Sequence, residues 1–227
     1  MTGTTTGTTT GTTTATAAGT PTAYPGTLGF GYAELAALLA MRPGPQSTAS
    51  AAALRITAEA ADGNVIRAGA SSLVAHGLAT VGDERELVVA GPAAAVLSAL
   101  SEAERRVDVA LLAPDRTGDS VLQVESSEFA ILLQPRSYFA WFAMPQAPAL
   151  SGAEALLAMI STHLDATPAG GASVYRRETP DRGRLLVKKG EGGWTVGYTD
   201  TGSDNIAFRE GLDDDALLAE LALVRGD

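Results

Sequence analysis

The chain has 227 residues, 45% of them apolar, which suffices for one large packed domain or two small ones. Its formal net charge of −10, with lysine only at Lys188 and Lys189, disfavours nucleic acids and anionic membranes as partners. The absence of cysteine excludes disulfides, thiolate nucleophiles and cysteine-ligated metals, and no apolar run approaches the ~18 residues of a membrane span. We therefore expect a cytoplasmic protein.

Residues 1–27 differ from the rest of the chain. They carry no charge, consist mainly of threonine, glycine and alanine, and contain three copies of Gly-Thr-Thr-Thr that begin at Gly3, Gly7 and Gly11. Such a segment buries too little apolar surface to offset its ordering entropy. The sequence predicts a disordered tail here, and not a signal peptide.

Residues 28–106 read as a mainly helical subdomain. A first helix is predicted over Phe30–Met41, ended by the Pro43-Gly44-Pro45 run. A second is predicted over residues 64–76, with Asp62 as its N-cap and Gly77 at its C-terminal end. A hairpin over residues 78–81 and 86–90 follows, and Pro92 then opens a helix that ends near Arg106.

From Val107 onwards the apolar pattern changes to the period of two that is typical of strands. Four strands are predicted over residues 107–112, 121–125, 129–134 and 138–144, followed by a helix over 151–164 with a Ser151–Glu154 capping box. Further strands over 172–177, 184–189, 194–199 and 206–209 precede a last helix over 213–224. Residues 107–227 thus form an antiparallel subdomain in which several strands and then one helix occur twice.

The predicted fold class is therefore α+β: antiparallel sheet or sheets with flanking helices, an N-terminal helical part, and repeated strands-then-helix units. The sequence contains no phosphate-binding glycine loop, no dinucleotide fingerprint and no nucleophile elbow. The histidines are His76 and His163, each near the end of its own predicted helix, where a helix dipole favours them. We predict no catalytic residue, no metal ligand and no cofactor, although an acid–base pair built from residues distant in the sequence stays open.

The segment Tyr138–Met144 concentrates aromatic residues. As a strand it would turn Tyr138, Phe142 and Met144 to one face of the sheet and Phe139 and Trp141 to the other. Burial on both faces is one interpretation. The alternative is that one face stays exposed and binds a partner, since tyrosine and tryptophan are common interface anchors. On the second interpretation the partner-binding residues are Tyr138, Phe139, Trp141 and Phe142.

Two resemblances bear on function. Residues 66–89 (IRAGASSLVAHGLATVGDERELVV) look like the last helix and wing of a winged-helix domain, which implies DNA binding. Against this, residues 28–102 hold four arginines and seven acidic residues, a net charge of −3. That balance is poor for phosphate contacts, so we expect this part to contact protein.

The folded chain as a whole resembles the actinobacterial EspG-type chaperones of type VII secretion. The likeness runs through the "ELAALLA" helix, "LVAHGLA" with its hairpin, the "VDVALLA" strand, "GGW" and the terminal "LLAELALV" helix. It implies a non-enzymatic cytosolic chaperone that shields an apolar helical secretion substrate of the PE/PPE-like or WXG100-like type. The alternatives are a winged-helix-like transcriptional regulator, an enzyme, or a subunit of a self-assembling structure.

Overall fold

The computed structural model describes residues 26–114, 118–199 and 206–227. The predicted tail therefore lies outside the described residues, except for its last two positions. In chain order the first part consists of β1 (Leu28–Gly31), α1 (Tyr32–Met41), α2 (Pro45–Ala53), α3 (Thr57–Ala61), α4 (Gly63–Ala75), β2 (Ala79–Val81), β3 (Leu87–Val89) and α5 (Gly91–Ser101).

The second part is a run of strands interrupted by one helix and closed by another. It consists of β4 (Arg105–Leu112), β5 (Asp119–Glu125), β6 (Ala130–Arg136), β7 (Ala140–Pro145), α6 (Gly152–Ala166), β8 (Gly171–Arg176), β9 (Arg184–Gly190), β10 (Gly193–Thr199), β11 (Phe208–Leu212) and α7 (Asp214–Arg225). Short 3₁₀ turns at Ser137–Phe139 and Pro180–Arg182 precede β7 and β9.

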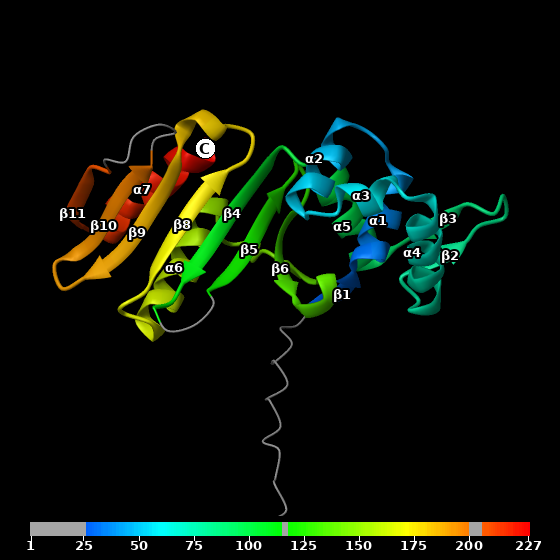
Figure 1. Ribbon diagram of the computed structural model, residues 1–227, viewed down its shortest axis with the longest axis horizontal. Coiled ribbons are helices and arrows are strands. Elements are labelled where there is room, and N and C mark those ends of the chain that lie inside the picture. The colour runs from blue at the N-terminus through cyan, green and yellow to red at the C-terminus, as the bar shows by residue number, and fades with distance from the viewer. Residues whose placement is uncertain (1–25, 115–117, 200–205) are drawn as a thin grey trace, which may run out of the picture.

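Nine of these strands form one antiparallel sheet in the order β1-β7-β6-β5-β4-β8-β9-β10-β11, and β2 and β3 form a separate hairpin. Figure 1 shows the helices α1–α5 gathered beyond the β1 end of the sheet, with the β2–β3 hairpin projecting from the body. The predicted α+β class with a large antiparallel sheet and flanking helices is confirmed.

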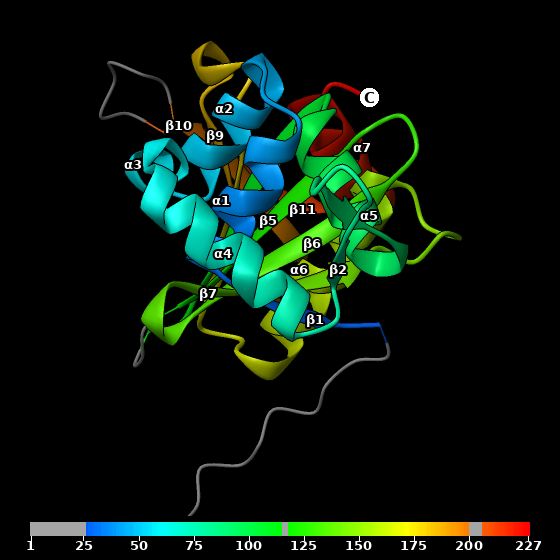
Figure 2. The same ribbon diagram turned by 90° about the vertical axis from the view of Figure 1, so that its right-hand side faces the viewer.

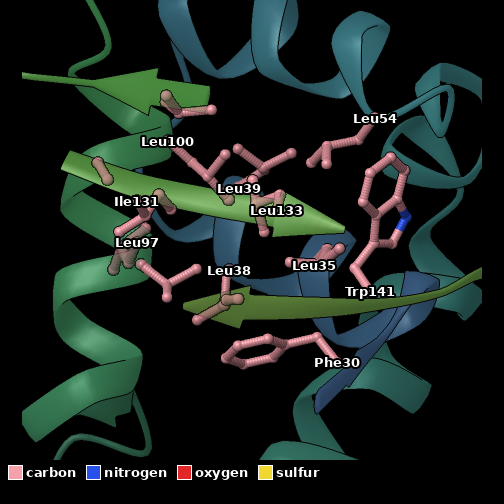
Figure 3. Packing of buried hydrophobic residues seen from close by; sticks show 14 of the residues in the cluster. Phe30, Leu35, Leu38, Leu39, Leu54, Leu97, Leu100, Ile131, Leu133 and Trp141 are labelled. Carbon is pink, nitrogen blue, oxygen red and sulfur yellow. The ribbon is translucent and has the colours of Figure 1, made fainter. Parts of the chain in front are cut away.

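The first core lies between the N-terminal helices and β5, β6, β7 and β1. Leu122 pairs with Leu133, and Leu133 with Ala143, so these residues share one face of the sheet. Leu35, Leu38, Leu39, Leu97 and Leu100 from α1 and α5 pack on that face (Figure 3).

The second core lies on the opposite face of the same sheet. Val109 of β4 pairs with Val121 of β5 on one side and with Val174 of β8 on the other. The side chains of these three residues point to the face opposite to that of Leu122, the residue after Val121 in β5. Leu156 and Ile160 of α6 and the apolar side of α7 bury this face. In Figure 1 both helices lie behind β4 and β8–β10, whereas Figure 2 brings α1–α5 in front of β6.

The repeated strands-then-helix pattern is present: β4–β7 precede α6, and β8–β11 precede α7. Two buried arginines link elements that are far apart in the sequence. Arg106 donates to Glu178 Oε1 at 3.0 Å and Ser50 Oγ at 3.0 Å. Arg225 donates to Glu125 Oε2 at 2.5 Å and to Gln123 Oε1.

Several local predictions are confirmed by the hydrogen bonds. Asp62 caps α4 by accepting from the Asn64 amide at 2.7 Å, and Gly77 follows that helix with φ of +69°. Ser151 and Glu154 form the predicted capping box. The hairpin, the start of α5 at Gly91-Pro92 and the last helix also lie where predicted.

Two predicted boundaries were wrong, and one helix was missed. Phe30 belongs to β1 and not to the first helix, because it pairs with Trp141 and is buried beneath α1. The first helix ends at Met41 as predicted, but α2, which Pro45 begins at a first-turn position that proline tolerates, was not predicted. The helix that Pro92 opens ends at Ser101, because Arg105 and Arg106 already pair with β5.

The predicted strand over 138–144 is shorter than expected. Tyr138 and Phe139 lie in the 3₁₀ turn with φ of +62° and +55°, so the two rings do not alternate across the sheet. The strand proper begins at Ala140. The division at residues 106 and 107 stays a prediction; β1, from the N-terminal part, pairs with β7 of the C-terminal part.

Candidate protein-binding site

The arrangement of the two cores leaves part of each sheet face without a covering helix. The first core covers β5–β7 on one face, and the second covers β4 and β8–β10 on the other. Each face is therefore open where the opposite face is covered, and a groove lies on each open area.

The groove beside α6, which we call the α6 groove, has a volume of about 840 Å³. The sheet floor is Val121, Leu132 and Met144, from three neighbouring strands, and Met159 lines the side formed by α6. Leu132 and Met144 pair across β6 and β7. Both are only partly buried, and Leu150, on the segment that leads into α6, is 38% exposed. The α6 groove therefore offers apolar surface that nothing in the described chain covers.

The polar side chains at the margin of the α6 groove are held by internal hydrogen bonds. Gln146 Oε1 accepts from Gln123 Nε2 at 2.7 Å, and Gln134 donates to Asp119. His163 Nε2 lies 2.9 Å from the Leu112 carbonyl oxygen. The margin is thus fixed and polar around an apolar centre, which is the anatomy of a protein interface.

The four aromatic residues predicted as partner-binding lie in different environments. Trp141 is 8% exposed and belongs to the first core (Figure 3). Phe142 points to the opposite face and lies beneath the Arg136 guanidinium, 5.0 Å from the ring centre. Tyr138 and Phe139 are 95% and 72% exposed, and Phe139 meets the Tyr32 ring edge to face at 6.3 Å.

Sequence reasoning did not single out Met144 and Met159. Met144 belongs to the predicted strand over residues 138–144. The strand alternation, which places it on the face opposite to the buried Trp141 and Ala143, was the signal that could have identified it. The strongest apolar stripe of α6, with Leu156 and Ile160, faces the second core. A weaker stripe of Ala155, Met159 and Thr162 runs along the groove side.

The histidines and the acidic clusters make local contacts. His76 Nδ1 lies 2.8 Å from Glu34 Oε1, next to the 2.7 Å hydrogen bond from Ser72. Asp213 caps α7, and Asp214 accepts from Trp194 Nε1 at 2.6 Å. Within residues 26–114, 118–199 and 206–227, no group of three histidine or acidic side chains has the spacing of a metal site.

One cluster with shifted pKa values lies away from both grooves. Burial raises the pKa of Tyr198 far above its ordinary range, reinforced by the hydrogen bond to Glu220. Burial opposes ionisation of Glu220, but hydrogen bonds from Arg209 and Tyr198 outweigh it and lower the pKa of Glu220. These groups join β10 and β11 to α7. No helix within the described ranges is long and apolar enough to cross a membrane.

The helix and wing suggested by residues 66–89 are present as α4 and the β2–β3 hairpin. Gly69 of α4 lies so close to α1 that a Cβ atom there would be 1.8 Å from the Ala33 carbonyl oxygen. Arg67, the cation on this helix, donates to Asn64 Oδ1 at 2.6 Å. One side of α4, the helix in the position of a recognition helix, is therefore packed against α1.

No family model matches the chain, and no curated protein matches it by sequence. Among solved structures, the fold is similar to that of EspG5, the type VII secretion system chaperone of Mycobacterium tuberculosis, solved in complex with the PE25–PPE41 dimer. The TM-score is 0.54 at 12% sequence identity, over 87% of this chain and 95% of that chain. The chain therefore shares the overall fold of a secretion chaperone.

Proposed function

We propose that this protein is a non-enzymatic chaperone that binds an apolar helical segment of a client protein in the α6 groove. The observation that carries the proposal is an uncovered apolar groove between a helix and a sheet floor, surrounded by fixed polar groups. Contiguous apolar surface of this kind on a water-soluble domain is typical of an interaction site.

The chemistry of the groove favours a helix as its ligand. An amphipathic helix presents a ridge of apolar side chains that lies along a groove, so binding needs shape and apolar contact more than directed hydrogen bonds. Met144 and Met159 suit this role because their unbranched, polarisable side chains adapt to different partner surfaces. The net charge of −10 keeps the protein soluble while the groove is empty.

The similarity in fold to EspG5 supports the class of client. That chaperone was solved with a PE–PPE dimer bound. We infer that the client here is a PE/PPE-like or WXG100-like helical secretion substrate, held in the cytoplasm before export. Such a role requires no cofactor, and we propose none.

The test is complex formation with co-expressed candidate clients of the PE–PPE and WXG100 types, measured by size-exclusion chromatography with light scattering. Met144→Glu and Met159→Glu place charge on the sheet floor and on the α6 side of the groove, and each should abolish a stoichiometric complex. The matched control is Leu223→Glu, at an α7 residue that is 57% exposed and lies outside the groove. Complexes that survive both groove substitutions, or no complex with any client, would overturn the proposal.

A further inference from the structure

The second groove lies on the other face of the sheet and has different chemistry. It has a volume of about 670 Å³ and extends from the α2–α3 connection across β4 and β8 to β9. Its lining includes Arg55, Arg177 and Arg184, with Tyr175 on the floor and Tyr138 and Phe139 at the rim. We call it the arginine groove.

The arginine groove is cationic in a strongly acidic protein. Of the described residues that line it, four are arginines and one, Asp108, is acidic. Asp108 is paired with Arg177, whose Nε lies 2.8 Å from its Oδ2. Neither Arg55 nor Arg184 forms an ion pair with any residue in the described part of the chain. Positive charge therefore remains in the groove without an acidic partner among the described residues.

Arg184 is held in position by its neighbours. Its guanidinium lies 5.1 Å from the centre of the Tyr175 ring, and its Nη1 donates to Ser173 Oγ at 3.2 Å. A guanidinium oriented over a ring and partly buried keeps its remaining N–H groups available and loses little entropy when it binds a carboxylate. The groove is thus arranged in advance for an anionic group.

Backbone conformations around the groove are also unusual. Arg55, Tyr138 and Phe139 have φ values of +60°, +62° and +55°, in the left-handed region that non-glycine residues rarely adopt. Strained residues of this kind cluster at binding sites. These backbone conformations place the Arg55 guanidinium and the Tyr138 and Phe139 rings at the opening of the arginine groove, and both rings are largely exposed.

We propose that the arginine groove is a second binding site, which takes an acidic peptide segment of a protein partner. The guanidinium groups of Arg55 and Arg184 match the side chains of neighbouring aspartates or glutamates, and the exposed rings match an aromatic or aliphatic side chain beside them. The remaining protein carries more than enough negative charge to repel a long polyanion, which favours a short acidic peptide over a nucleic acid. The site is on the opposite face from the α6 groove and does not depend on what binds there.

The probe is a fluorescein-labelled heptapeptide of alternating aspartate and glutamate with one central tyrosine, titrated with the full chain and followed by fluorescence anisotropy. Binding should weaken as salt is raised, because exposed charge pairs are screened. The double variant Arg55→Gln/Arg184→Gln should lose on the order of 10- to 100-fold in affinity, since two charge-assisted contacts are removed.

The matched control is Arg85→Gln, since Arg85 also has a left-handed backbone, with φ of +64°, but lies in the β2–β3 connection. It should bind like the unaltered chain, and circular dichroism should show that both variants stay folded. Three results would overturn the proposal: no binding, equal binding of the peptide with amides in place of carboxylates, or equal loss in both variants. Tighter binding of a labelled single-stranded oligonucleotide at the same arginines would assign the groove to nucleic acid instead.

Discussion

The buried Arg225 allows a quantitative test of how much the contact between α7 and β5 contributes to the free energy of unfolding. Its guanidinium is 1% exposed and contacts Glu125 at 2.5 Å, Gln123, and Asp227 at 3.0 Å, so it ties the end of α7 to β5. Replacing it in Arg225→Met preserves side-chain length and apolar contact but removes the charge. Glu125 and Gln123 then lose their donor in a confined site.

The size of the effect follows from burial. Loss of one member of a buried ion pair costs about 3–5 kcal/mol because the remaining partner stays desolvated. Glu125 is 28% exposed and keeps Arg105 at 3.1 Å, which places the cost near the lower limit, at about 3 kcal/mol. For a folded region of this size that loss corresponds to a fall in Tm of roughly 6–12 °C.

The assay is urea unfolding at neutral pH, followed by circular dichroism, together with the thermal midpoint. Arg209→Met is the control, because Arg209 pairs with Glu220 but is 59% exposed, so water screens its charge and its removal should lower the free energy of unfolding far less than Arg225→Met does. Equal losses in the two variants, or a loss below about 1 kcal/mol for Arg225→Met, would refute the argument that this arginine joins α7 to the sheet.

Three further predictions concern the core, a helix contact and a cap. Trp141→Ala should lower the free energy of unfolding by about 3–5 kcal/mol in urea titrations, because Trp141 fills the first core. Gly69→Ala should lower it by about 1–2 kcal/mol despite alanine's better helix propensity, because the new Cβ meets the Ala33 carbonyl. Hydrogen bonds from the Ser151 amide and hydroxyl lower the pKa of Glu154, so Ser151→Ala should raise that pKa towards its ordinary value of 4.5 in an NMR titration. Because the folded-state pKa is lowered, this stabilisation is present above pH 4.5 and is lost as the pH falls through the folded-state pKa, so the stability difference between the two proteins should narrow in acid.

Local rules explain which parts of the fold could be predicted. The helices with side-chain caps at Asp62, Ser151 and Asp213 were found because a cap and an apolar period coincide in the sequence. The strands β4 and β9 were found because their alternation has one buried face. The repeated order of strands followed by a helix could be predicted because the capped helices and the alternating strands were both recognisable.

Non-local contacts explain what was missed. β1 is four residues long and is a strand because it pairs with β7 more than 100 positions later, which no local pattern records. α2 is rich in alanine and serine, and two of its serines are buried because they bond to Arg42 and Leu100 carbonyl oxygens. The α6 groove was missed for the same reason, since its lining residues come from separate strands and a helix.

The two grooves follow from one architectural fact, the placement of the two cores on opposite faces of one sheet. Helices α6 and α7 both lie on the face of the second core, over β4 and β8–β10, whereas α1–α5 cover the opposite face over β5–β7. Each face therefore keeps an open area, and the two areas differ in the side chains that point into them. On β6 and β7 these include Leu132 and Met144, which make an apolar surface; on β8 and β9 they include Tyr175 and Arg184, which make a cationic one. The two grooves lie on opposite faces and share only Val121 and Arg136 among the described residues that line them, so a substitution at a residue of one groove alone, such as Met144 or Arg184, should leave ligand binding in the other unchanged.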